Sequence, residues 1–290
     1  MKTFFIILLA SLTLYAQDAF ITAIKLDKIL NDKNLVLVDT ADLKTYNKGH
    51  IPHAHQVDIS KFRHWVDNTY LLMNSPQEIQ KVARSLGINK DSHIVLYGHN
   101  RGKELLKTSY IALALIVNGA KHISILNGGY ADWDYEFEDM PEKFSTKKDK
   151  IKRGNFTTNF NPNVLVDLEY VKAHIGKVPM IEARPKAFYT GQRKSNGVRR
   201  LGHISEATSS FWRDKFNIDD SLKSKKEINE IYVDLNKLSP DKEVITYCTG
   251  GLEASMNWYI LTQYLHYKDV KLYDASMKEW GNLDSTPMQK

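Results

Sequence analysis

The chain has 290 residues, of which 42% are hydrophobic and 26% are charged. This length exceeds the roughly 100 to 200 residues of one compact domain, and the composition excludes a disordered chain and a multispan membrane protein. The formal net charge is +6, but the basic residues lie in short scattered groups and form no continuous basic and aromatic platform. We therefore expect a globular protein of two domains with no nucleic-acid partner.

The first residues differ from the rest of the chain. Lys2 carries a positive charge, residues 4–14 form an apolar run, and Ala16 offers a small residue at a cleavage point. The run is shorter than the ~20 apolar residues that a helix needs to span a bilayer, which disfavours an uncleaved anchor. We predict a secretory signal peptide over residues 1–16 and an exported, periplasmic protein with no membrane attachment after cleavage.

Short apolar, β-branched runs alternate with helical patterns along the remaining chain. In the first half we expect strands at residues 35–38, 94–97 and 122–126, and helices at residues 77–86 and 103–117. In the second half we expect strands at residues 179–181, 244–247 and 270–273, and helices at residues 225–235 and 252–265. Such alternation is typical of an α/β fold with a mainly parallel sheet and helices on both faces.

Corresponding features recur along the chain at a nearly constant offset. A Gly-His-Ile triplet at residues 49–51 reappears at residues 202–204, and Trp133 near the end of one unit matches Trp280 near the end of the other. The strand-like runs of the two halves are offset by a similar amount. Agreement among several such pairs indicates an internal duplication.

A polar, charge-rich stretch separates the two units. Residues 142–162 lack apolar periodicity and contain Gly154 and Pro162, which is typical of a linker. We therefore predict one α/β domain over residues 24–141 and a second over residues 163–290.

Cys248 is the one cysteine of the chain, so no internal disulfide can form. It directly follows the expected strand 244–247 and precedes a Thr-Gly-Gly turn and the expected helix 252–265. Ligand sites in open α/β sheets lie at this end of the strands, where the helix dipole favours anions. The same field favours the thiolate, and the two glycines permit a backbone that turns several amides toward the sulfur. We predict a nucleophilic thiol rather than a small buried core residue.

Taken together, these motifs resemble the rhodanese family in its tandem-domain form, typified by thiosulfate and mercaptopyruvate sulfurtransferases. The resemblance covers roughly residues 24–288. It rests on the GHIP and GHI motifs at residues 49–52 and 202–204, the loop YCTGGLEA at residues 247–254, and the closing segments LNGGYADW at residues 126–133 and YDASMKEWG at residues 273–281. It implies two rhodanese-like domains.

The resemblance also implies the chemistry of the thiol. The Cys248 thiolate would attack the outer sulfur of thiosulfate or 3-mercaptopyruvate and leave a persulfide, which cyanide or a thiol of a small molecule or protein then removes. Such a double displacement predicts ping-pong kinetics and needs neither a metal nor an organic cofactor. The anionic donor and persulfide would be held by the loop residues Thr249, Gly250, Gly251, Leu252, Glu253 and Ala254.

The first unit has Gly98 at the position that corresponds to Cys248. Without a sulfur atom this loop cannot form a persulfide, so we interpret the first domain as non-catalytic support for the cleft. His99 and Arg101 follow Gly98, and we weigh an anion contact there against an ordinary surface loop.

Several residues depart from the family pattern. Residues 249–251 match neither the basic loop of thiosulfate enzymes nor the Gly-Ser-Gly loop of mercaptopyruvate enzymes. Glu182 stands where Asp is usual, and Phe188 stands where a substrate-binding Arg is usual. We take Arg193 and Arg199 as the candidates that supply the missing positive charge.

Glu253 adds a negative charge to the loop. We expect its side chain to lie exposed in the first helical turn, where it favours the helix dipole. If it pointed inward, it would oppose a dianionic donor. Because Glu253 and Phe188 both weaken the anion site, the alternative function is a non-catalytic persulfide carrier or interaction module that delivers sulfur to a partner protein.

Two other chemistries are disfavoured. A phosphatase with a similar loop needs an Arg after five intervening residues, and Ala254 occupies that place. His50, His53 and His55 lie close together in the sequence, but Pro52 lies among them and His50 belongs to a structural motif, so we expect no metal site.

Overall fold

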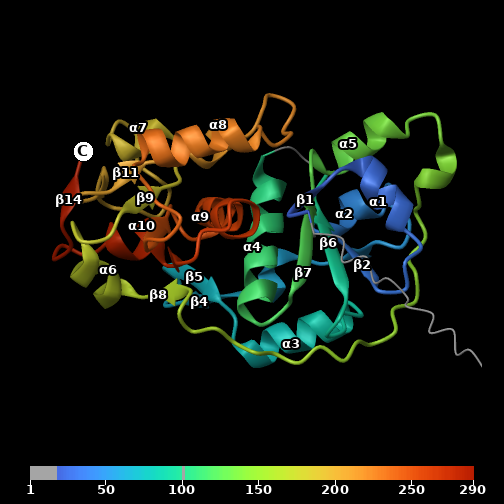
Figure 1. Ribbon diagram of the computed structural model, residues 1–290. Coiled ribbons are helices and arrows are strands. Elements are labelled where there is room, and N and C mark those ends of the chain that lie inside the picture. Colours follow the sequence, from blue (N-terminus) through green and yellow to red (C-terminus); the bar gives the residue numbers. More distant parts are fainter. Residues whose placement is uncertain (1–17, 100–101) are drawn as a thin grey trace, which may run out of the picture.

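The computed structural model describes residues 18–99 and 102–290. The predicted signal peptide at residues 1–16 and the candidate Arg101 lie outside the described residues. Two α/β units lie side by side, with the C-terminus at the far end of the second unit (Figure 1). Within the described ranges, no helix combines the length and apolar character needed to cross a membrane.

The first unit is built on a five-stranded parallel sheet in the order β1-β7-β6-β2-β3. Its elements are β1 (Phe20–Ile21), α1 (Ala23–Ile29), β2 (Leu35–Asp39), α2 (Leu43–Tyr46), β3 (His55–Gln56), a 3₁₀ turn (Ile59–Lys61), β4 (Arg63–Val66), β5 (Tyr70–Met73), α3 (Pro76–Ser85), β6 (His93–Tyr97), α4 (Lys103–Val117), β7 (His122–Leu126), α5 (Gly129–Glu136) and a 3₁₀ turn (Pro141–Lys143). Strands β4 and β5 form a separate antiparallel hairpin.

The second unit contains a second five-stranded parallel sheet, in the order β11-β9-β12-β13-β8. Its elements are β8 (Leu165–Val166), α6 (Leu168–His174), β9 (Met180–Glu182), α7 (Lys186–Tyr189), β10 (His203–Ile204), β11 (Thr208–Ser209), a 3₁₀ turn (Trp212–Lys215), α8 (Lys225–Asn229) with a π-helical end (Glu230–Leu235), β12 (Val244–Tyr247), α9 (Leu252–Tyr259) with a π-helical end (Ile260–Tyr264), β13 (Val270–Tyr273), α10 (Ser276–Trp280) and β14 (Met288–Gln289). Strands β10 and β14 pair separately.

The two sheets have the same strand order when each strand is matched to its counterpart, with β6 and β12 at the centre. This confirms the predicted α/β fold and the internal duplication. The paired Gly-His-Ile motifs adopt matching structures: the His50 ring stacks on Tyr46 at 3.8 Å, and the His203 ring stacks on Tyr189 at 3.7 Å. The outermost strands are only two residues long, so they give no periodic signal in the sequence.

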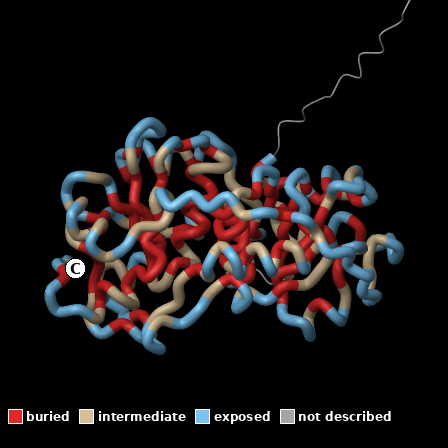
Figure 2. Tube along the Cα trace, turned by 90° about the horizontal axis from the view of Figure 1, so that it is seen from below, coloured by how far each residue is buried: buried red, intermediate tan, exposed pale blue. Residues whose placement is uncertain are grey.

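One hydrophobic core runs through both units. Alternate residues of a strand face opposite sides, so Ile94 and Leu96 of β6 face this shared core while Val95 faces the outer helices of its own unit. Helices α4 and α9 lie against each other between the two sheets (Figure 1). The buried segments continue from one unit into the other (Figure 2). The outer face of each sheet packs on a smaller cluster of its own.

Buried polar contacts also join the units. The hydroxyl groups of Ser109 on α4 and Ser255 on α9 lie 2.8 Å apart. The Tyr259 hydroxyl donates to the carbonyl oxygens of Ala19, at 2.7 Å, and Ile123, at 3.2 Å. Satisfied polar groups inside an apolar interface fix its register, because any shift would leave them buried without partners.

The chain between the two sheets packs against the first unit. Gly154 N donates to Arg84 O at 2.9 Å, Phe156 N donates to Ile88 O at 3.1 Å, and the Phe156 ring is buried in the shared core. Residues 150–156, called the strap below, therefore lie along the first unit beside α3, although their composition is that of a polar linker.

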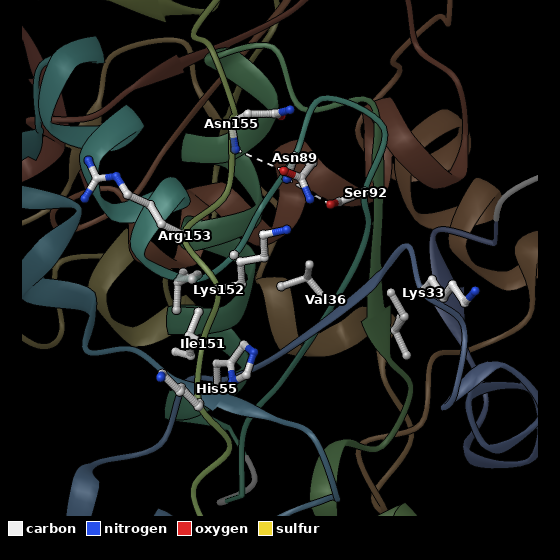
Figure 3. A pocket seen from close by; sticks show the side chains of 13 residues that line it. Lys33, Val36, His55, Asn89, Ser92, Ile151, Lys152, Arg153 and Asn155 are labelled. Carbon is white, nitrogen blue, oxygen red and sulfur yellow. Dashed lines mark hydrogen bonds between the residues drawn. The ribbon is translucent and has the colours of Figure 1, made fainter.

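A pocket of about 480 Å³ lies under this strap (Figure 3). The strap contributes Ile151, Lys152 and Asn155 to its wall, and Asn155 N donates to the Asn89 side chain at 3.0 Å. All of its lining residues come from the first unit and the strap, so it is separate from the loop that carries the cysteine.

Lys215 is the most unusual charge in the second unit, because its side chain is fully buried. Its ammonium donates to Ser210 Oγ and Phe211 O, both at 2.8 Å, and lies over the Tyr232 ring. Burial lowers the pKa of Lys215 from 10.5 to about 7. Between these two pH values the unfolded chain binds more protons at this position than the folded protein does, so stability rises with pH.

We predict that the free energy of unfolding increases between pH 7 and pH 9 and that Lys215→Met flattens this increase. The variant has a similar volume but no titrating group, so the difference in slope should approach about 1 kcal/mol per pH unit. Urea unfolding at each pH measures both slopes. Equal slopes for the two proteins would show that Lys215 does not titrate in this range.

Candidate active site

Cys248 lies at the carboxyl end of the central strand β12, in the turn that leads into α9. All four residues of β12 are buried, and the side chain of Cys248 is itself 0% exposed. The strand–turn–helix setting predicted from the sequence is confirmed. The central strand therefore holds the thiol at the edge of the sheet where ligand sites of this fold class form.

The turn depends on Gly251. Its φ is +86°, and a Cβ atom at this position would lie 2.1 Å from Oδ1 of Asp274. Only glycine combines this backbone conformation with so close an approach of another side chain. Gly250 has no such restriction, since a Cβ atom there would make ordinary contact with Lys278.

The turn rests on the start of α10. Cys248 N donates to Ser276 Oγ at 3.0 Å, Met277 N donates to Cys248 O at 3.1 Å, and Lys278 N donates to Thr249 O at 2.9 Å. Ser276 itself has a left-handed φ of 52°. These bonds hold the backbone on both sides of the sulfur. They give a structural role to the closing segment at residues 273–281, which was noted in the sequence.

The polar neighbours of the Cys248 sulfur shift its pKa in opposite directions. Backbone N–H groups of Gly250 and Ala254 donate to it and lower its pKa, as expected for an amide cradle. Burial and the Glu253 carboxylate act in the other direction and outweigh the amides, so the pKa of Cys248 rises to about 12. The expectation that the turn favours the thiolate is therefore wrong, because desolvation of the charged form dominates.

Glu253 does not lie exposed as the sequence led us to expect. Its carboxylate turns back over the loop, accepts a hydrogen bond from Thr249 N at 3.4 Å and interacts with the Cys248 thiol. Burial raises the pKa of Glu253, while its contacts with Cys248, Thr249 and Arg184 act in the opposite direction. An acid in the first turn of a helix is usually exposed, but here the first turn of α9 places Glu253 beside the Cys248 sulfur.

A buried cation lies near the loop and was not singled out from the sequence. Arg184 lies two residues after the end of β9, is 2% exposed, and pairs with Glu182. It also donates to Ser195 Oγ at 3.1 Å and to Gly202 O at 2.8 Å. Ser195 Oγ in turn lies 3.2 Å from Thr249 Oγ1, so a chain of polar contacts connects Arg184 to the loop.

The two candidate arginines have partners outside the Cys248 loop. The Arg193 guanidinium lies 5.3 Å from the centre of the Phe188 ring, and Arg199 donates to Asn282 O and to Asp284. An open pocket of about 630 Å³, lined by residues 194–199 and Asn282, adjoins them. The structure thus places Arg199 at this pocket, while Arg193 lies over the residue that replaces the family's usual Arg.

The first unit reaches into the loop through its hairpin. Arg63 of β4 donates to Gly250 O at 2.7 Å and lies 3.5 Å from the Asp274 carboxylate and 4.4 Å from the centre of the Tyr110 ring. Asp274 also accepts from Tyr110 OH at 2.7 Å and from Met73 N at 2.8 Å. No motif in the sequence marks Arg63, because its importance comes from a contact with a distant part of the chain.

In the first unit, the space that a side chain at position 98 would need is occupied by Glu104. A Cβ atom at Gly98 would lie 2.7 Å from Glu104 Cβ, so a cysteine side chain does not fit there without a shift. His99 pairs with Asp39 at 2.7 Å and stacks on the Tyr130 ring. His99 is thereby engaged inside its own unit.

The histidines near the first Gly-His-Ile motif have local partners. His50 bonds to Tyr46 O and Lys147 O, and His53 pairs with Asp149 at 2.7 Å. Among the residues that the structure describes, no group of three side chains is arranged to hold a metal ion.

We predict that Arg63→Ala destabilises the protein by about 3 kcal/mol and lowers reaction of Cys248 with sulfur donors, because the buried Asp274 carboxylate loses its cation. Urea unfolding and mass spectrometry of the loaded protein measure the two effects. Lys61→Ala, which alters an exposed residue of the same segment, is the matched control. Unchanged stability in Arg63→Ala would show that the pair does not stabilise the loop.

Comparisons with known proteins agree with this arrangement. A rhodanese-like domain is matched twice, over residues 22–136 and 167–283. The chain is 29% identical over 265 residues to the sulfur carrier protein TtuD of Thermus thermophilus, covering 88% of this chain and 90% of the relative. It is 28% identical over 248 residues to the 3-mercaptopyruvate sulfurtransferase of Escherichia coli, covering 84% of each protein.

Solved structures share the fold. The crystal structure of SseA from Escherichia coli, a 3-mercaptopyruvate sulfotransferase, matches with a TM-score of 0.74 at 24% identity and covers 90% of this chain and 99% of that one. The crystal structure of YnjE matches with a TM-score of 0.82 at 18% identity and covers 94% and 68%. The chain belongs to the rhodanese family and has its tandem-domain form.

Proposed function

We propose that this protein is a sulfurtransferase that moves sulfane sulfur from thiosulfate or 3-mercaptopyruvate to a thiol or cyanide through a persulfide on Cys248. The observation that carries this proposal is the position of the sulfur atom. It lies at the end of the central strand, with the N–H groups of Gly250 and Ala254 directed at it.

The arrangement suits a covalent sulfur carrier. Attack by Cys248 on the donor sulfur would leave a terminal sulfur that bears negative charge, one bond farther along the side chain. Preorganised backbone N–H groups stabilise such a charge without reorganisation, particularly where water is excluded. Transfer of this sulfur to an acceptor thiol or cyanide restores Cys248 and completes a double displacement.

A second candidate function is delivery of the persulfide to a partner protein without turnover of small acceptors. One observation favours it: a relative that aligns over most of the chain is named as a sulfur carrier.

We predict that incubation with thiosulfate or 3-mercaptopyruvate adds the mass of about one sulfur atom to the protein and that Cys248→Ser abolishes this gain. Intact-protein mass spectrometry detects the persulfide, and release of thiocyanate, pyruvate or sulfide measures turnover. Reduction with excess thiol should remove the added mass, as expected for a persulfide.

The outcomes separate the candidates. Mass gain with turnover supports the enzyme, and mass gain without turnover of small acceptors supports the carrier. No gain from either donor would exclude both.

We further propose that the protein is exported and acts in the periplasm after removal of residues 1–16. The proposal rests on the charged start and the apolar run described above. We predict that the mature protein recovered from a periplasmic fraction of a Gram-negative host begins at Gln17, which N-terminal sequencing would reveal. A cytoplasmic protein that retains Met1 would contradict it.

A further inference from the structure

Glu253 lies beside the reacting sulfur. Its carboxylate accepts from the Thr249 amide and interacts with the Cys248 thiol, in a turn that also carries the Thr249 hydroxyl and the backbone N–H groups of Gly250 and Ala254. It is therefore an ionisable side chain in contact with the reacting sulfur that is able to accept a proton from it.

The charged groups around Glu253 leave it able to exchange a proton. Cys248 faces it from its own loop, and Glu182 and Arg184 face it from the end of β9. Arg184 is already paired with Glu182 and donates to Ser195 and Gly202. Because Arg184 has these other partners, it does not fix Glu253 as the carboxylate of an ion pair.

We propose that Glu253 carries the proton of Cys248 during sulfur transfer and thereby selects donors whose leaving group takes up a proton. This inference rests on the proposed persulfide chemistry and assigns a catalytic and specificity-determining role to a residue of the same loop.

For an α-keto thiol such as 3-mercaptopyruvate, the proton completes the reaction. Glu253 takes the proton of the Cys248 thiol, and Sγ attacks the donor sulfur. The carbon–sulfur bond breaks, and its electron pair stays on carbon as the enolate of pyruvate. Glu253 then gives its proton to that carbon. Cys248 keeps the transferred sulfur as –S–SH, so atoms and electrons balance without an added oxidant or reductant.

Thiosulfate does not need this proton returned to a carbon atom. Attack on its outer sulfur releases sulfite, which leaves with the electron pair of the sulfur–sulfur bond, and the proton of the Cys248 thiol passes to sulfite or to solvent. The dianion must also approach the negative charge of Glu253, and repulsion between these like charges in a partly desolvated site raises the energy of that approach. Glu253 therefore assists the first donor class and hinders the second.

The first unit provides a counterpart without a reacting thiol. Glu104, at the second position of α4, accepts from His99 N at 2.7 Å, just as Glu253 at the second position of α9 accepts from Thr249 N. Since no cysteine lies beside Glu104, that residue cannot carry the proton of a thiol, yet it makes the same bond to the turn. The experiment must therefore distinguish a brace from a proton carrier.

Glu253→Gln makes this distinction, because the amide oxygen can still accept from Thr249 N but the side chain cannot exchange a proton. We expect kcat/KM with 3-mercaptopyruvate to fall about 100-fold, the usual range for loss of general acid–base catalysis. We expect kcat/KM with thiosulfate to stay the same or rise. Glu104→Gln, the matched change in the first unit, should leave the ratio of the two activities unchanged.

A second measurement uses the unaltered protein. Turnover of 3-mercaptopyruvate should be slower in D₂O than in H₂O, whereas the thiosulfate reaction should show little solvent isotope effect. This comparison holds even if Glu253→Gln fails to fold.

Equal changes with both donors in Glu253→Gln, or equal isotope effects, would identify Glu253 as a brace and overturn the inference while leaving the persulfide function intact. Turnover of thiosulfate alone by the unaltered protein would also overturn it. Failure of Cys248 to gain sulfur from either donor would instead remove the proposed function itself.

Discussion

The buried carboxylate of Asp274 is the contact on which the active loop most depends. It follows β13 in the second unit, yet its partners Arg63, Tyr110 and Met73 all belong to the first. Arg63 continues from this carboxylate to the carbonyl of Gly250, next to the sulfur-bearing turn. A buried charge without a partner is costly, so this carboxylate is favourable only while both units are in place. The geometry around Cys248 is thereby a property of the whole chain.

The sulfur atom lies where two influences compete. Backbone amides and the start of α9 favour negative charge, whereas burial and the Glu253 carboxylate oppose it. The opposing influences dominate and raise the pKa of the Cys248 thiol. A persulfide differs in this respect, because its charge lies on the terminal sulfur, farther from the buried Cβ. The same cradle can therefore keep the thiol neutral at rest and still accommodate an anionic intermediate.

Much of the fold could be predicted from the sequence. The central strands and the helices α4 and α9 are long and strongly apolar, and Gly251 marks the turn by a conformation that other residues avoid. The duplication was visible because residues such as Trp133 and Trp280 have the same buried role in each unit.

The parts that sequence patterns missed depend on distant contacts. The hairpin of β4 and β5 is short and partly exposed, and nothing local indicates that Arg63 lies against Gly250. The inward direction of Glu253 depends on which face of α9 meets the loop, and first-turn acids are usually solvated. Arg184 lay within a segment noted for Phe188, but its burial was not apparent. Local patterns define elements, whereas side-chain partners across the interface require the tertiary structure.

The shared core between α4 and α9 has a consequence for the stability of the second unit. The first unit has no cysteine and therefore cannot itself form a persulfide. Here its removal would expose the apolar side of α9 to water and leave Tyr259 and Ser255 without their partners. Exposed apolar surface of this kind promotes aggregation. The first unit thus supplies part of the interior of the second, and loss of the unit without a cysteine would destabilise the unit that carries it.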